Sequence, residues 1–173
     1  MTTHPVTNDL RPQFLEAMSR MAASVSVLTT DGPGGPAGLT ISSLTSVSAD
    51  GRAPSILACI HHQSPAAAAI MANRVFSANV LRHDQAHISD RFSGRHGAKG
   101  ADKFEGIDIE VGDTGAARIK RAAVTFDCRV VTALLWETHH LFVGEVVSVI
   151  LPDPVDAPLI YAARGYRKLL QEE

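Results

Sequence analysis

The sequence contains little cysteine, no long hydrophobic run and no excess of one charge. Among 173 residues only Cys59 and Cys128 are cysteines, and each lies inside an apolar, strand-like run. Thiols in such runs are usually buried and inert, so we expect no disulfide and no metal site. The longest apolar stretches, residues 66–72 and 130–136, are too short to cross a bilayer.

Charge and the start of the chain exclude two further classes of protein. The formal net charge is −2 and the lysines and arginines are scattered, unlike the basic stripe of a nucleic-acid-binding protein. The chain does not begin with basic residues followed by an apolar run, so it does not resemble a secretory signal. We therefore expect a cytoplasmic protein that binds neither nucleic acid nor membrane.

Length and composition predict one folded domain. A hydrophobic fraction of 45% with 20% charged residues is too apolar for a disordered chain. A chain of 173 residues forms one core of ordinary size. We take residues 1–173 as a single domain, with residues 1–8 as a flexible N-terminus.

Three segments carry helix signals. Apolar residues at three- and four-residue spacing predict an amphipathic helix over residues 10–21, with Asp9 as a candidate cap. Ser64, followed by proline and an alanine-rich segment, predicts a helix over residues 65–73. Residues 83–92 predict a short helix that ends at a glycine.

The other patterned segments are β-like. They are residues 24–30, 37–48, 54–61, 75–81, 123–136, 139–151 and 158–162. Residues 31–36 are rich in glycine and proline and indicate a hairpin turn; no βαβ unit surrounds them, which excludes a dinucleotide-binding loop. Six or seven strands without regular βαβ alternation predict a mainly β fold, an antiparallel barrel with a few short flanking helices.

The most distinctive polar feature is the segment of residues 39–48. It carries six hydroxyl side chains, on Thr40, Ser42, Ser43, Thr45, Ser46 and Ser48. Hydroxyls are small donors and acceptors that suit the edge of a flat heteroaromatic ligand, although a solvated strand has the same composition.

Two features near predicted helices suit an anion. A helix that begins at Ser64 directly after a buried strand presents free N–H groups and a positive dipole end, which bind phosphate, although most such starts are plain caps. Residues 93–102 are glycine-rich and basic, and form either a connector or a lid over a ligand phosphate.

Histidines occur in two pairs. Adjacent strand residues face opposite ways, so one of His139 and His140 should point into a cleft and the other away from it. His83 and His87 lie four residues apart in a predicted helix but lack the glutamate of a zinc-protease motif, and we interpret them as solvated.

Taken together, these segments resemble the short-chain flavin reductases that partner two-component flavin-dependent monooxygenases, over residues 14–169. The matching pieces, in chain order, are GLTISSLTSVS at 38–48, LACIHHQSPA at 57–66, FSANVL at 76–81, ISDRFSG at 88–94, DKFEGI at 102–107, FDCRV at 126–130, HHLFVGEV at 139–146 and PLIYAARGY at 158–166. Each piece is weak singly, but eight in the right order are specific.

This resemblance implies an antiparallel, Greek-key, FMN-binding split β-barrel and a homodimer. It also implies hydride transfer from NADH or NADPH to FMN or FAD, with reduced flavin supplied to a monooxygenase. On that resemblance the isoalloxazine is held by Thr40, Ser42, Ser43, Ser46, Val47 and Ser48, and the ribityl and phosphate end by Cys59, His61 and Ser64. Phe92 would wall the pocket, and Tyr166 would close over the nicotinamide.

The chain departs from the family at one motif. A Gly-Asp-His triplet has its histidine five residues before a strand glycine, and counting back from Gly144 reaches His139, preceded here by Glu137 and Thr138. The resemblance implies that His139 is the catalytic histidine, acting as a hydrogen-bonding orienter near flavin and nicotinamide.

The altered triplet leaves two alternatives open. One is a flavin-binding carrier or redox sensor with little reductase activity, and the other is a flavin-dependent reductase of a different acceptor. The sequence also does not distinguish FMN from FAD or NADH from NADPH.

Overall fold

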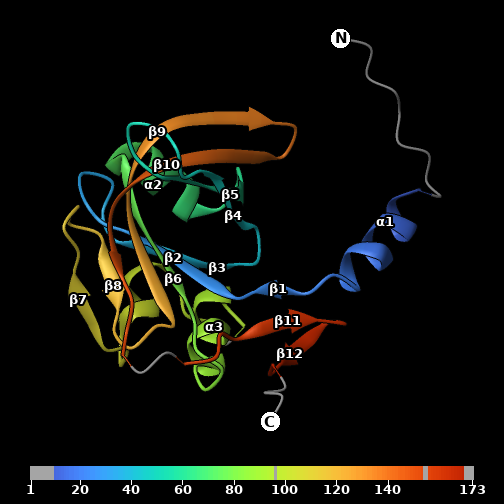
Figure 1. Cartoon of the computed structure of the whole chain (residues 1–173). Helices are drawn as coiled ribbons and strands as arrows, with labels where there is room; N and C mark the ends of the chain where they lie inside the picture. The colour runs from blue at the N-terminus through green and yellow to red at the C-terminus, as the bar shows by residue number, and fades with distance from the viewer. Residues whose placement is uncertain (1–9, 96, 154–155, 170–173) are drawn as a thin grey trace.

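A seven-stranded antiparallel sheet, curved into a split barrel, dominates the computed structural model of the protein, which describes residues 10–95, 97–153 and 156–169 (Figure 1). In spatial order its strands are β3 (Ala37–Ile41), β2 (Ser26–Thr30), β6 (Val75–Val80), β9 (Val124–Trp136), β10 (His139–Ile150), β5 (Ser55–His61) and β4 (Leu44–Ser48). All neighbours pair antiparallel. The predicted mainly β, antiparallel split-barrel fold with short flanking helices is confirmed.

Alternation along the strands builds the core. In β5 the side chains of Ile56, Ala58 and Ile60 are buried, while their neighbours are half-buried or exposed, as expected for a strand with one face on the core. Phe76 is fully buried where it crosses Gly144, and a Cβ on that glycine would lie 2.5 Å from the Phe76 ring. The strand glycine therefore makes room for the largest core side chain.

Three further helical elements pack on or near the barrel. α2 (Pro65–Asn73) begins after Ser64, as predicted, and buries its alanine-rich face. α3 (Ala86–Ser93) ends at Gly94, as predicted, and the short 3-10 helix η1 (Gly100–Phe104) follows. Gly94 adopts a φ of +79°, a left-handed conformation that glycine accepts without strain.

The helix around His83 is shorter than predicted. Gln85 accepts a hydrogen bond from the Arg82 backbone N–H through its Oε1 atom, at 2.9 Å, so this segment forms a turn before α3 begins. His83 is therefore outside the helix, and its Nδ1 lies 3.6 Å from the Asp156 carboxylate. His83 and His87 do not share a helical face, which corrects the prediction.

Two small sheets complete the strands. β1 (Ala23–Ser24), β11 (Ile160–Ala162) and β12 (Gly165–Arg167) form one, and β7 (Ile109–Val111) and β8 (Ala117–Ile119) form the other. The segment predicted at residues 158–162 thus contains a strand, but one outside the main sheet. The sequence did not predict β7, β8 or β12, because runs of three residues are too short for a periodicity to emerge.

The predicted strand over residues 37–48 is divided in two. The chain bends at Ser42 and Ser43, so that β3 lies at one edge of the seven-stranded sheet and β4 lies at the other. Consequently the hydroxyl-rich segment does not line a single surface.

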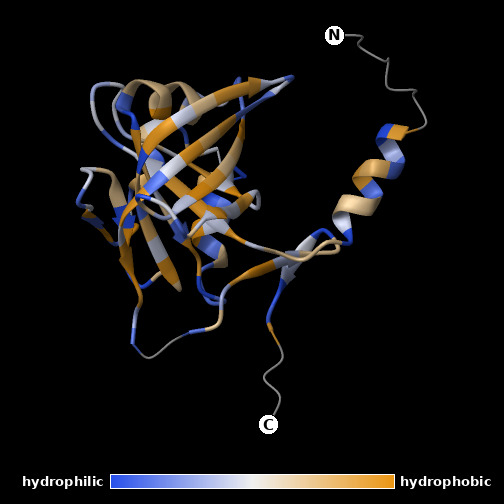
Figure 2. Ribbon diagram, turned by 45° about the horizontal axis from the view of Figure 1, so that its top comes forward, coloured by the Kyte–Doolittle hydropathy of each residue, from blue (hydrophilic) through white to orange (hydrophobic). Residues whose placement is uncertain are grey.

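The N-terminal helix α1 (Leu10–Ser19) is confirmed, yet it buries none of its residues. It projects away from the barrel, and apolar residues run along it (Figure 2). Leu10, Phe14, Met18 and Met21 are each 45–60% exposed. Asp9 and the flexible segment expected at residues 1–8 lie outside the described residues. Within the described ranges, no helix has both the length and the apolarity that a membrane span requires.

Candidate functional site

A hollow of about 170 Å³ opens between β3, α3 and the β11–β12 hairpin. Its lining comprises Val25, Thr40, Ile41, Ser42, Ser89, Ser93, Arg95, Tyr161 and Tyr166. We call this the hydroxyl hollow. The structure therefore brings together three residues singled out from the sequence, Thr40, Ser42 and Tyr166, although Tyr166 is more than 120 positions away from the other two.

The hydroxyl of Thr40 fixes one wall of this hollow. Its Oγ1 donates to the Ser89 carbonyl at 2.7 Å and so ties β3 to α3. Ser42, two residues on and directly before the bend, is exposed. Thr40 therefore shapes the hollow, while Ser42 presents a hydroxyl to its opening.

A polar cluster around Asp90 lies next to this contact on α3. The Tyr166 hydroxyl lies 2.7 Å from Oδ1 of Asp90 and 2.9 Å from Oγ of Ser89. Arg95 pairs with the same carboxylate at 2.8 Å, and its guanidinium lies 5.8 Å from the centre of the Tyr166 ring. Burial raises the pKa of Tyr166, and its hydrogen bond to Asp90 acts in the same direction, so Tyr166 remains a protonated donor.

A second hollow of about 350 Å³ lies beside the N-terminus of α2. It is lined by Ala37, Gly38, Ser64, Pro65, Ala66, Gly94, Gly97, Ala98, Lys99, Gly100 and Lys103. We call this the α2 hollow. The side chain of Ser64 makes no capping hydrogen bond, so its hydroxyl is available to a ligand. Its other side is lined by five residues of the segment 93–102, which was predicted as a connector or a lid: Gly94, Gly97, Ala98, Lys99 and Gly100.

Lys103 lines the α2 hollow and hydrogen-bonds to the two elements beside it. Its Nζ donates to the carbonyls of Gly38 and Phe92, at 3.1 and 2.8 Å. Burial lowers the pKa of Lys103. The lysine thus fastens the glycine-rich segment to β3 and α3 and places a cation beside a helix N-terminus, an arrangement suited to an anionic ligand.

Phe92 does not line either hollow. It is fully buried, packs edge to face against Phe104 at 5.1 Å, and lies under Gly38, where a Cβ would come within 2.5 Å of its ring. The resemblance implied that Phe92 forms a wall of the pocket. In the structure its ring instead packs under the β3 backbone at Gly38, and so affects the hollows only indirectly.

A third group of predicted residues meets where β5 and β10 run side by side. Cys59 accepts a hydrogen bond from Ser43 Oγ through its carbonyl, at 2.8 Å, and burial raises the pKa of its thiol. His61 lies opposite His139 in the strand register, with ring centres 5.2 Å apart.

His139 and His140 have different surroundings, as neighbours on a strand should, while the expectation that one of them points into a cleft stays a prediction. His139 is exposed, whereas His140 is half-buried with its ring centre 5.5 Å from that of the core residue Phe142. The side chain of Thr138 adds a polar contact, with its Oγ1 2.9 Å from Nδ1 of His139.

Three of the predicted flavin-binding residues lie elsewhere. Ser46, Val47 and Ser48 line an apolar groove of about 440 Å³ with Phe126, Val146 and Val149. The groove shares no lining residue with the hydroxyl hollow, because the chain bends at residues 42–43 and β4 pairs with β5 instead of continuing β3. Within the described chain, the segment from Thr40 to Ser48 therefore contributes to two surfaces.

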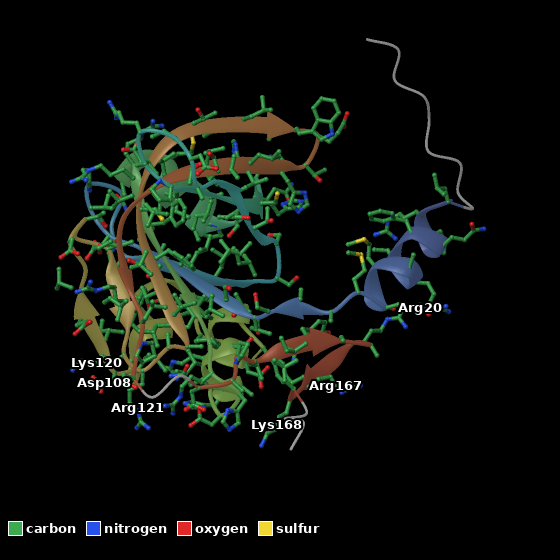
Figure 3. All side chains as sticks on the ribbon, viewed as in Figure 1. Arg20, Asp108, Lys120, Arg121, Arg167 and Lys168 are labelled. Atoms are coloured by element: carbon green, nitrogen blue, oxygen red, sulfur yellow. The ribbon has the colours of Figure 1, made fainter. Side chains whose placement is uncertain are left out.

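Part of the hydroxyl hollow was not predicted from the sequence. Ser89 and Ser93 lie four residues apart in α3 and face it together, a spacing that helical periodicity would have exposed. Arg95 gave no signal, because its place depends on the turn after α3. A further polar hollow, lined in part by residues 106–108 and 120–121, shares no lining residue with these sites; Asp108, Lys120 and Arg121 are labelled in Figure 3.

Comparisons with known proteins show the family of this chain. Residues 18–170 match the family model of the flavin reductase like domain. The FMN reductase (NADH) RutF of Stutzerimonas stutzeri is 34% identical over 160 residues, which cover 92% of this chain and 89% of that protein.

Solved structures show the same similarity. BorF, the flavin reductase component of a bacterial two-component tryptophan halogenase, superposes with a TM-score of 0.83 at 26% identity, covering 94% of this chain and 99% of that one. Nitrilotriacetate monooxygenase component B from Mycobacterium thermoresistibile gives a TM-score of 0.84 at 27% identity, covering 95% and 89%. From its matched sequence and its fold, the chain belongs to the flavin reductase like family.

Proposed function

We infer that this protein is an NADH-dependent flavin reductase. The observation that carries the inference is the hydroxyl hollow, in which residues from β3, α3 and the β11–β12 hairpin converge, in a chain whose relatives are named FMN reductase (NADH). FMN is the flavin that those names support. FAD and NADPH remain substrates for the assay to test.

The polar groups of the two hollows suit a flavin. Ser42 offers a hydroxyl to the ring edge, and Tyr166, whose proton is donated to Asp90, lines the same hollow with its ring and offers its oxygen as an acceptor. The free Ser64 hydroxyl, the N-terminus of α2 and the cation of Lys103 suit the phosphate end. When bound, the flavin supplies the redox chemistry, accepting a hydride at its N5.

The work left to this chain is positioning. Hydride transfer requires the nicotinamide C4 to meet the flavin N5 in a stacked geometry, and no general base is needed. We assign His139 to orient the nicotinamide by hydrogen bonding. Replacing it by alanine should lower turnover with NADH while leaving flavin binding largely intact; unchanged turnover would refute this assignment.

The experiment that tests the function is a direct assay. Purified protein is mixed with FMN or FAD, and the oxidation of NADH or NADPH is followed by the loss of near-ultraviolet absorbance. Rapid oxidation that depends on both flavin and protein is the expected result. Flavin binding without turnover would favour a flavin-binding carrier or redox sensor. Turnover only with another acceptor would favour a flavin-dependent reductase of that acceptor.

We further propose that reduced flavin leaves for a partner oxygenase, as the names of the similar component B and BorF suggest for those proteins. The protein is proposed to act in the cytoplasm, as a single domain and as a homodimer. The exposed apolar faces of α1 and of the β9–β10 arm, with Phe14, Leu134 and Trp136 each more than half exposed, support self-association.

A further inference from the structure

Two histidines meet at the tip of the β9–β10 hairpin, one from the hairpin itself and one from the neighbouring strand β5. The hairpin turns at Glu137 and Thr138, and the first residue after it is His139. His61, the last residue of β5, is its cross-strand neighbour, with the rings edge to face at 79°.

The protonation of His61 follows from its hydrogen bond. The backbone N–H of Gln63 donates to Nδ1 of His61, at 3.2 Å. A backbone N–H is only a donor, so this Nδ1 must act as the acceptor and carries no proton. In the neutral ring the proton is then on Nε2, which is left as a donor.

The Thr138 hydroxyl contacts the corresponding ring atom, Nδ1, of His139. Its Oγ1 lies 2.9 Å from Nδ1 of that ring. The turn also holds Thr138 by its backbone, because its carbonyl accepts a hydrogen bond from the His62 N–H at 2.9 Å. The threonine is thus anchored to the end of β5 while its side chain contacts the ring.

We propose that Thr138 is a positioning residue: its hydroxyl donates to Nδ1 of His139 and holds that ring in the tautomer with its proton on Nε2. Both histidines then present an Nε2–H donor, and the chemistry they recognise is a neutral acceptor oxygen, such as the carboxamide carbonyl of a nicotinamide. The identity of the ligand rests on the proposed function. The tautomer of His139 does not depend on that function.

The tautomer is tested by nitrogen NMR on histidine-labelled protein. The wild-type His139 Nδ1 should show the shift of an unprotonated, pyridine-like nitrogen at a pH where the ring is neutral. In Thr138→Val, which keeps the side-chain shape without the hydroxyl, that nitrogen should move toward the average of the two tautomers, and Thr138→Ser should restore it. A pyrrole-like Nδ1 in the wild type, or a spectrum unchanged in Thr138→Val, would overturn the proposal.

The effect of Thr138 on NADH turnover is measured in a separate kinetic assay. Loss of one orienting hydrogen bond should lower kcat/KM for NADH roughly three- to tenfold in Thr138→Val, with flavin affinity unchanged and Thr138→Ser close to wild type. Thr132→Val is the matched control, since Thr132 is an exposed strand residue of the same hairpin, and it should change neither readout. An equal loss of flavin affinity in Thr138→Val would point to a structural role instead.

The two proposals fail in different ways. If the wild-type protein oxidises no NADH, the proposed function is refuted while the nitrogen spectrum still decides the tautomer. If it is an active reductase and the spectrum is unaffected by Thr138→Val, only the role of Thr138 is refuted.

Discussion

Glu137 occupies a backbone conformation that favours glycine. Its φ is +50°, in the left-handed region, as the first residue of a two-residue turn between Trp136 and His139. Such turns place glycine at this position because a Cβ is strained there. This explains physically why the family triplet begins with glycine, and shows that the hairpin still closes without it.

Replacing Glu137 by glycine should therefore stabilise the protein by about 1 kcal/mol, by removing left-handed strain. The free energy of unfolding in urea measures the effect. The control is Asp50→Gly at an exposed loop residue without positive φ, which should lose about 0.5 kcal/mol through chain entropy. A loss of stability at position 137 would show that the strain is not relieved by glycine.

Tyr166 links its hairpin to α3 in a pH-dependent way. Burial raises its folded-state pKa, so as pH rises the unfolded chain loses this proton before the folded protein does. The stability from this group is therefore complete below its unfolded pKa of about 10 and is lost as pH rises through the folded value.

The difference in unfolding free energy between wild type and Tyr166→Phe isolates this effect. It should be constant near pH 8 and move in favour of Tyr166→Phe as pH rises above about 10. Lys103, whose pKa is lowered by burial, titrates equally in both proteins and cancels. A difference that stays flat to pH 12 would mean that Tyr166 does not titrate as a buried donor.

Individual site residues were predictable where a local pattern or the family resemblance singled them out. The run of hydroxyls revealed Thr40 and Ser42, and the resemblance revealed Tyr166. Asp90, which contacts both Tyr166 and Arg95, gave no signal, because the contacts that define it join α3 to segments far away in the chain.

At the scale of elements, Asp127 fastens the β7–β8 hairpin to the barrel. Its carboxylate is buried on β9 and accepts hydrogen bonds from the Thr114 N–H at 2.9 Å, the Thr114 hydroxyl at 2.6 Å and the Ser77 hydroxyl at 2.8 Å. Gly112 passes so close that a Cβ there would lie 2.6 Å from Oδ2 of the carboxylate. Three donors thus depend on one side chain.

Asp127→Ala should lower the free energy of unfolding by about 2–4 kcal/mol, because it leaves buried donors unpaired. Urea unfolding followed by circular dichroism measures the loss. Asp113→Ala, on the same hairpin but exposed and 3.7 Å from Arg118, should change stability by less than about 0.5 kcal/mol. Equal effects at the two positions would refute the fastening role.

The helices and strands themselves were largely predictable, but the pairing of the strands in the sheet was not. Long strands such as β9 and β10 show clear β-patterns, and α2 starts at its Ser-Pro signal. The bend at residues 42–43 was missed because the hydroxyl pattern continues through it, although β3 and β4 end at opposite edges of the sheet. Strand order depends on long-range pairing, which local periodicity does not encode.

At the scale of the whole molecule, α1 is the element that the described chain leaves without an apolar partner. Phe14 and Met18 lie on its apolar face, 58% and 45% exposed, and the helix touches the rest of the chain through polar contacts such as Glu16 with Arg164 at 2.7 Å. An amphipathic helix gains most of its stability by burying that face. A second copy of the chain would supply the missing surface.

The double substitution Phe14→Glu with Met18→Glu should therefore convert the proposed dimer to a monomer, observed by light scattering as a halved mass. Gln13→Glu, on the polar side of the same helix, is the control and should remain dimeric. A wild-type monomer, or a dimer untouched by the double substitution, would contradict this role for α1.

The central claim is that this chain brings a reduced nicotinamide and a flavin together for hydride transfer. The most direct measurement is the anaerobic mixing of protein, FMN and NADH, with the loss of flavin visible absorbance followed by stopped flow, using NADH deuterated at C4 for comparison. The account predicts stoichiometric flavin reduction, far faster than without protein and slowed by deuterium at the transferred position. FMN that binds but stays oxidised in the presence of NADH would contradict it.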